Sequence, residues 1–159
     1  MAVLLDQIVA EHRDENAIVD SRGATTWGQL NERVERLVHA LRDRGLTSGD
    51  CVMSMLGNQA EAIEVALACA HGGWLLVPVN WHWVADELAY VVKDSGSKAL
   101  FVDVMHVDVA VGAGPMDGCD HRIVVGVGFR RKHVQDGDVH LELHRQRPGE
   151  GQGPQRGGG

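Results

Sequence analysis

The chain has 159 residues, of which 44% are hydrophobic and 23% are charged, an ordinary composition for a soluble globular protein of about one domain. The formal net charge is −7, which argues against nucleic acid or an anionic membrane as a partner, because both attract basic surfaces. The longest apolar stretch, at 65–79, is too short to span a bilayer, so we expect no transmembrane segment.

Four segments have the patterns of helices. A short helix is expected at 2–12. The next, at 27–44, has the clearest signal, because Thr26 and Gln29 form a capping-box pattern and Gly45 follows as a stop. Its apolar stripe consists of Leu30, Val34, Leu37, Val38 and Leu41, and its polar face of Glu32, Arg33, Arg36 and Arg42.

Two further helices are expected in the middle of the chain. Asn58 is a good cap for a helix that continues to residue 70, and glycines end it. Its inward face is predicted to be Ile63, Leu67 and Ala70. In the last helix, at 85–93, the inward residues are predicted to be Leu88, Val91 and Val92.

Apolar runs of strand length alternate with these helices. They lie at 51–56, 74–79, 98–102 and 122–127, and a shorter run at 17–20 ends in a polar turn. The run WLLVPV at 74–79 is continuous, which is typical of a strand buried on both faces. This alternation predicts an α/β fold with a mainly parallel sheet flanked by helices.

The chain changes character near residue 128. Residues 1–120 hold 8 Lys or Arg against 18 Asp or Glu, a net charge of −10, whereas residues 121–159 hold 7 against 4, a net charge of +3. The last segment has no sustained hydrophobic period, and such a composition does not offset a backbone entropy cost of about 1–2 kcal/mol per residue. We expect a folded unit at 1–128 and a disordered or out-of-frame tail at 129–159.

No residue can be assigned to catalysis, cofactor binding or metal binding from its pattern. A GxxxxGK[ST] phosphate loop is absent, and two glycine pairs that begin like dinucleotide fingerprints lack the third glycine. His140 and His144 have the spacing of a helical metal pair but lie in the expected tail. His82 follows a predicted strand, where α/β proteins place ligands, although packing at the sheet rim is the favoured interpretation.

The cysteines and the N-terminus indicate a cytoplasmic protein. Cys51, Cys69 and Cys119 lack a C-x-x-C spacing, which indicates reduced thiols, and the first two lie in apolar runs that predict burial. No secretory signal is expected, because Asp6 interrupts the first apolar run.

Two stretches resemble motifs of AMP-forming acyl-CoA synthetases. The sequence TTWGQL at 25–30 is similar to their first motif, of the form [LT]-[ST]-[YW]-x-[EQ]-L. The sequence ACAHGGWLLVPVN at 68–80 is similar to their second, K-A-G-x-x-x-[VL]-P-[LIV]-[ND], with His71 in place of the usual alanine. The continuation PVNWHWVADELAYVVKDSGSKALFV is close to the form in fatty-acyl-CoA synthetases, and the likeness covers residues 10–103, more weakly to 128.

The resemblance implies the N-terminal subdomain of the adenylate-forming fold. Members join a carboxylic acid, such as a fatty acid, to AMP from ATP with Mg²⁺ and then transfer the acyl group to CoA, a reaction of lipid metabolism. Their phosphate loop, of the type YTSGTTGxPKG, and their later ribose-binding and lysine-bearing segments have no counterpart here. The resemblance therefore carries over no catalytic residue and no cofactor for this chain alone.

Three interpretations remain open at this point. The chain is a truncated and catalytically silent ligase segment, or a non-catalytic module that binds another protein, or one half of a split ligase that is active with a complementary synthetase segment. The loss of periodicity near Phe129 favours truncation.

The truncation hypothesis makes a prediction about the gene. If the tail is out of frame, a one-base shift near codons 120–130 restores the Ser/Thr/Gly-rich phosphate loop of the family shortly downstream. Translation of the downstream nucleotide sequence in all frames checks this, and only unrelated translation in every frame would contradict a frameshift.

Overall fold

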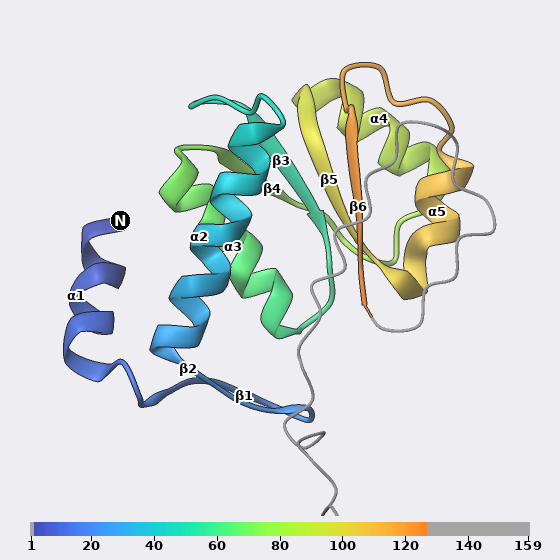
Figure 1. Ribbon diagram of the computed structural model, residues 1–159. Coiled ribbons are helices and arrows are strands. Elements are labelled where there is room, and N and C mark those ends of the chain that lie inside the picture. Colours follow the sequence, from blue (N-terminus) through green and yellow to red (C-terminus); the bar gives the residue numbers. More distant parts are fainter. Residues whose placement is uncertain (1, 127–159) are drawn as a thin grey trace, which may run out of the picture.

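A computed structural model describes residues 2–126, with side chains from Leu5 onward (Figure 1). The helices are α1 (Ala2–His12), α2 (Trp27–Asp43), α3 (Ala60–Gly72), α4 (Ala85–Ser95), α5 (Val107–Gly112) and the short 3₁₀ helix η1 (Val104–His106). The strands are β1 (Asn16–Asp20), β2 (Gly23–Thr26), β3 (Cys51–Met55), β4 (Leu75–Pro78), β5 (Ser97–Asp103) and β6 (His121–Val125). The predicted tail at 129–159 lies outside the described residues.

A four-stranded parallel sheet is the centre of the structure. Its strands lie in the order β4-β3-β5-β6, and every neighbouring pair is parallel. The chain crosses from β3 to β4 through α3, from β4 to β5 through α4, and from β5 to β6 through η1 and α5. Strands β1 and β2 form a separate antiparallel hairpin before α2. The predicted α/β class with a mainly parallel sheet is confirmed.

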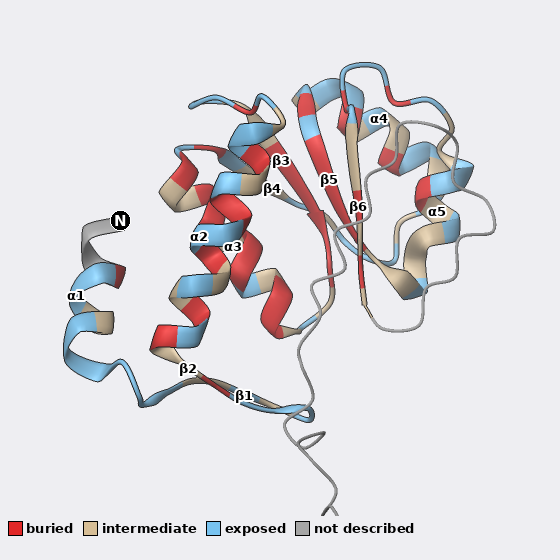
Figure 2. Cartoon of the chain, in the orientation of Figure 1, coloured by how far each residue is buried: buried red, intermediate tan, exposed pale blue. Residues whose placement is uncertain are grey.

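Two helical layers enclose the sheet, and alternate residues of β5 point into two different cores. Ala99 and Phe101 pack in the core that α2 and α3 cover, whereas Leu100 and Val102 pack in the core that α4 and α5 cover. All four side chains are at most 1% exposed. Figure 1 shows α2 and α3 together on one side of the sheet and α4 and α5 on the other, and Figure 2 shows buried residues concentrated on the strands and the inner helix faces.

Helix α2 follows the sequence prediction closely. Thr26 and Gln29 form the expected capping box, in which the Gln29 N–H donates to Thr26 Oγ1 at 3.3 Å and the Thr26 N–H to Gln29 Oε1 at 3.0 Å. All five predicted stripe residues are buried. The outward position predicted for Arg33 is wrong, because its side chain is only 12% exposed and its Nε lies 2.8 Å from Oε1 of Glu64 on α3.

The prediction for α3 is wrong about its cap and about Ile63, whereas Leu67 is partly buried and packs against the core, as predicted. The N-cap residue is Gln59 rather than Asn58, and Ile63 is 45% exposed. The buried side chains include Val65, Ala68 and Cys69, but also the carboxylates of Glu61 and Glu64. The spacing of apolar residues could not predict this buried face, because two of its members are carboxylates. They are buried because arginines from α2 and from the β1–β2 turn compensate their charges.

Strand β4 is an edge strand rather than the doubly buried strand that its composition predicted. Among the described strands it pairs with β3 alone, and Leu75 is 59% exposed. The Leu75 N–H donates to Asp50 O, just before β3, and the Val79 N–H donates to Ser54 O on β3. The backbone of the alternate residues Leu76 and Pro78 therefore points away from β3, along the edge of the sheet. Pro78 has no N–H, which limits pairing of this edge with another strand.

Leu37 and Arg36 provide a test of the face assigned to α2. Leu37 is 2% exposed in the core beneath the helix, whereas the neighbouring Arg36 is exposed and donates from Nε to its own helix at Glu32 O. Leu37→Asp buries an unpaired carboxylate, and we expect a loss of more than about 3 kcal/mol in the free energy of unfolding. Arg36→Asp should cost less than about 1 kcal/mol. Urea unfolding followed by circular dichroism measures both, and equal stability of the two variants would mean that the buried face is misassigned.

Candidate functional site

The carboxyl ends of the four parallel strands meet at one edge of the sheet, which is where open α/β sheets bind ligands. We define the carboxyl edge as the residues at the ends of the strands or directly after them, at 56–59, 79–84, 103–106 and 126. Two of its polar side chains, one after β3 and one at the end of the neighbouring strand β5, form a hydrogen bond. Gln59 Nε2 donates to Asp103 Oδ2 at 3.0 Å, and Asp103 Oδ1 accepts the Met105 N–H at 2.9 Å. The Asp103 carboxylate therefore begins η1 and joins it to the start of α3.

An aromatic stack forms the other part of the carboxyl edge. The indole of Trp81 contacts two imidazoles, with ring centroids 3.4 Å from His82 and 5.4 Å from His106. Asn80 shapes the turn, because its Oδ1 accepts the His82 N–H at 2.9 Å. Trp81 remains 43% exposed, so the stack presents a partly open aromatic surface.

The structure places His82, the histidine of interest, in this stack. It lies on the rim of the sheet, as expected, but it does not cap the next helix, because Glu87 Oε2 accepts the Val84 N–H there at 3.1 Å. Sequence analysis missed the Gln59–Asp103 pair and the role of His106. Gln59 lies in the segment after β3, and Asp103 is the last residue of β5. Because β3 and β5 are parallel, their carboxyl ends lie at the same edge of the sheet, and this proximity could have been inferred from the sequence.

The described part of the carboxyl edge does not provide the groups that bind nucleotide phosphates. It contains no lysine or arginine, and its Asp103 carboxylate would repel an anion. Across the described residues, no group of three or more His, Cys, Asp or Glu side chains could hold a metal ion. The residues present therefore do not fit ATP with its Mg²⁺.

The two sequence motifs support the scaffold. In the first, a Cβ on Gly28 would lie 2.8 Å from Arg13 Cγ, so glycine allows the segment after α1 to pass close to α2. In the second, a Cβ on Gly72 would overlap the indole of Trp74, which is itself 5% exposed. Gly73 follows in the left-handed conformation, with φ of 77°, and ends α3.

The buried Cys69 is not a candidate for a nucleophile. All three cysteines lie within the described residues and none forms a disulfide. Cys69 is 2% exposed, and burial raises the pKa of its thiol to about 12, so it is protonated at neutral pH. The predicted burial of Cys69 is confirmed, and Cys51 is half-buried.

An ion pair holds the β1–β2 turn against α3, which begins at the carboxyl edge. Arg22 donates to both carboxylate oxygens of Glu61, at 2.8 and 2.7 Å, and also contacts Asp20 Oδ2 at 3.0 Å. Burial raises the pKa of Glu61, but the hydrogen bonds from Arg22 and its own backbone together with nearby positive charge outweigh burial and hold the pKa below its usual range. The Glu61 carboxylate stays charged because Arg22 compensates it.

The Arg22–Glu61 pair predicts a pH-dependent stability. Because the pKa of Glu61 is lower in the folded protein than in the unfolded chain, the pair stabilises the fold above the unfolded pKa, and this is lost as pH falls through the folded pKa. Arg22→Leu leaves a buried carboxylate uncompensated, which should cost about 2 kcal/mol at pH 7. The cost should shrink as pH falls through the folded pKa of Glu61, because the protonated, uncharged side chain no longer depends on Arg22 for compensation.

Urea unfolding between pH 3 and pH 7 measures this difference. Arg42→Leu, which removes an exposed arginine from the last turn of α2, is the matched control and should show a small effect that varies little with pH. A cost of Arg22→Leu that is the same at pH 3 and pH 7 would show that the two side chains are not coupled.

The sequence and the structure both match adenylate-forming enzymes. Residues 5–148 match the family model described as AMP-binding enzyme, a match that continues past the predicted boundary at 128. The chain is 38% identical over 96 residues to the fatty acid–[acyl-carrier-protein] ligase ScoC of Streptomyces coeruleorubidus, covering 59% of this chain and 18% of ScoC. It is 30% identical over 136 residues to the probable acyl-activating enzyme 5, peroxisomal, of Arabidopsis thaliana, covering 85% of this chain and 25% of that protein.

A solved structure shares the fold. The putative long-chain-fatty-acid CoA ligase from Rhodopseudomonas palustris CGA009 superposes with a TM-score of 0.75 and 26% identity, covering 89% of this chain and 38% of that one. The chain thus spans only a minor part of the length of the relatives it matches. Among the residues that the structure describes, no helix has the length and apolarity needed to cross a membrane. With a family match over most of its length, the chain belongs to the AMP-binding enzyme family and contains the N-terminal part of a fatty-acid/CoA ligase-like, adenylate-forming domain.

Proposed function

We propose that these 159 residues are the N-terminal part of a fatty-acid–CoA ligase and do not catalyse its reaction by themselves. The reaction is ATP plus a carboxylic acid to acyl-AMP and pyrophosphate, followed by transfer of the acyl group to the thiol of CoA with release of AMP. A cytoplasmic location and a role in lipid metabolism belong to this proposal. So does a scaffold unit at 1–128, with the segment at 129–159 outside it.

The observation that carries the proposal is that the described part of the carboxyl edge contains no lysine or arginine. Adenylation requires groups that neutralise the charge of the reacting phosphates, and preorganised donors of this kind supply several kcal/mol. Positioning of the acid oxygen in line with the α-phosphate supplies about 7–11 kcal/mol more. The described edge offers the neutral Gln59 and the acidic Asp103, and the full sequence lacks the glycine-rich phosphate loop.

The internal roles of the two family motifs support the same proposal. Thr26 and Gln29 cap α2, and Gly72 makes room for the Trp74 indole. These residues are already engaged in folding contacts and offer no group to a substrate. In this proposal the N-terminal part builds and orients a sheet, and the phosphate-binding groups belong to segments beyond this one.

The prediction is that the purified 159-residue chain shows no acid-dependent exchange of pyrophosphate into ATP. Short-, medium- and long-chain acids should all give background rates, with or without Mg²⁺ and CoA, because the chain lacks the groups that hold the phosphates. An intact acyl-CoA ligase in the same assay is the positive control. Reproducible exchange that requires the acid and is abolished by denaturing the chain would overturn the proposal.

A second candidate function is one half of a split ligase. It is considered because the chain spans only a small part of the length of its relatives. Because the chain spans 18% of one relative and 25% of another, the remaining family motifs lie in segments that a second polypeptide could carry. The same exchange assay is repeated after the chain is mixed with a polypeptide that carries the phosphate loop and later motifs. Exchange that appears only in the mixture supports the split enzyme, and exchange in neither sample supports the silent segment.

A further inference from the structure

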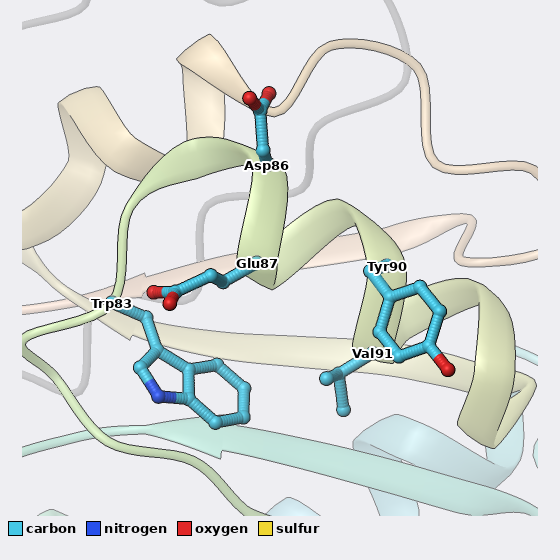
Figure 3. A pocket seen from close by; sticks show the side chains of 5 residues that line it. All are labelled: Trp83, Asp86, Glu87, Tyr90 and Val91. Atoms are coloured by element: carbon cyan, nitrogen blue, oxygen red, sulfur yellow. The ribbon is translucent and has the colours of Figure 1, made fainter.

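A hollow beside α4 combines aromatic surface with a carboxylate. It is lined by Trp83, Asp86, Glu87, Tyr90 and Val91. Glu87, Tyr90 and Val91 are three and four residues apart on one helix, so they share one face, and Trp83 approaches this face from the segment before α4. Figure 3 shows the Glu87 side chain reaching toward Trp83, the Tyr90 ring next to Val91 at the other end of the hollow, and Asp86 pointing away.

The geometry points to an arginine side chain of a partner polypeptide as the occupant: we propose that the guanidinium stacks against Trp83 and Tyr90 and pairs with Glu87. Aromatic faces attract cations, and a planar guanidinium also stacks on them. A carboxylate beside the rings adds a partner for its N–H donors. None of the lining residues carries a positive charge, so the hollow complements a cation.

The exposure of the lining favours a side chain delivered by a protein over a free small molecule. Tyr90 is 68% exposed, and Asp86 and Glu87 are exposed as well. Small-molecule sites enclose most of their ligand, which an open hollow on a helix surface cannot do. Nucleic acid is disfavoured by the net charge of −7. The inference concerns a surface of the scaffold and does not depend on the proposed reaction.

Glu87 has one oxygen engaged within the fold and can be changed without loss of that bond. Its Oε2 accepts the Val84 N–H at 3.1 Å, and Glu87→Gln keeps an amide oxygen for this role while it removes the charge. Tyr90→Ala removes an exposed ring and should leave the fold intact. Asp43→Asn is the matched control, because it removes an exposed carboxylate from α2, on the opposite side of the sheet.

The test follows the indole N–H signal of Trp83 in ¹H–¹⁵N spectra of the full chain, assigned with Trp83→Phe. The probes are the tripeptide acetyl-Gly-Arg-Gly-amide and its lysine and norleucine counterparts. We expect a saturable shift with the arginine peptide, weaker binding of the lysine peptide and no shift with norleucine. Glu87→Gln and Tyr90→Ala should each raise the Kd of the arginine peptide about threefold or more, and Asp43→Asn should leave it unchanged.

Several results would overturn the assignment. The absence of a saturable shift at millimolar peptide would show that the hollow does not hold a guanidinium. Equal binding of the lysine peptide would remove the stacking contribution. An equal effect of Glu87→Gln and Asp43→Asn would mean that only overall charge matters. A Trp83 shift that grows with protein concentration in the absence of peptide would assign the surface to self-association instead.

Discussion

The burial of β5 on both of its faces is the constraint on which the other elements depend. Four consecutive side chains, at 99–102, are at most 1% exposed, so a helical layer must cover each side of the strand. Parallel pairing with β3 and β6 satisfies the backbone of β5 within the sheet, and it requires each connection to return across a face. The connections through α3, α4 and α5 therefore also provide the cover that the strand needs. A polar substitution in β5 would disturb the core into which that residue points, because alternate residues of the strand pack in different cores.

The two helical layers differ in chemistry. The interface between α2 and α3 contains the Arg33–Glu64 pair, and the nearby Arg22–Glu61 pair joins α3 to the hairpin. Removing one partner from such a pair is costly because the other charge remains buried, whereas replacing both partners by well-packed apolar residues is often neutral. We therefore interpret these pairs as specifying how α3 is oriented against α2. The layer of α4 and α5 buries mainly apolar side chains, including Leu88, Val92 and Ala110.

In this chain the two family motifs make folding contacts rather than contacts suited to a substrate. The two motifs that identify the family form a helix cap and a close approach of glycine to tryptophan, which are folding contacts. The described carboxyl edge, where a ligand would be expected, carries an aromatic stack and the hydrogen bond between Gln59 and Asp103. It contains no lysine or arginine. A family match over most of the chain is thus compatible with the absence of a phosphate site in its described part, because the motifs record a shared scaffold.

Local patterns in the sequence determined the elements and the fold class. The capping box at Thr26 and Gln29 and the stripe on α2 depend on residues a few positions apart, so spacing alone could locate them. The helix at 107–112 was missed because it is only six residues long and has too few turns to show a period.

Contacts between distant segments were decided only by the tertiary structure. The burial of Glu61 and Glu64 depends on arginines 39 and 31 residues away in the chain, and hydrophobicity alone predicts such carboxylates to be exposed. The edge position of β4 depends on strand order, which composition does not specify, so its apolar run was predicted to be buried on both faces. The Trp81–His106 stack and the Gln59–Asp103 pair likewise require the parallel register that brings the strand ends together. The sequence by itself thus determined periodicity, caps and family membership, whereas strand order and charge compensation came from the packed structure, because they join side chains that no short-range pattern connects.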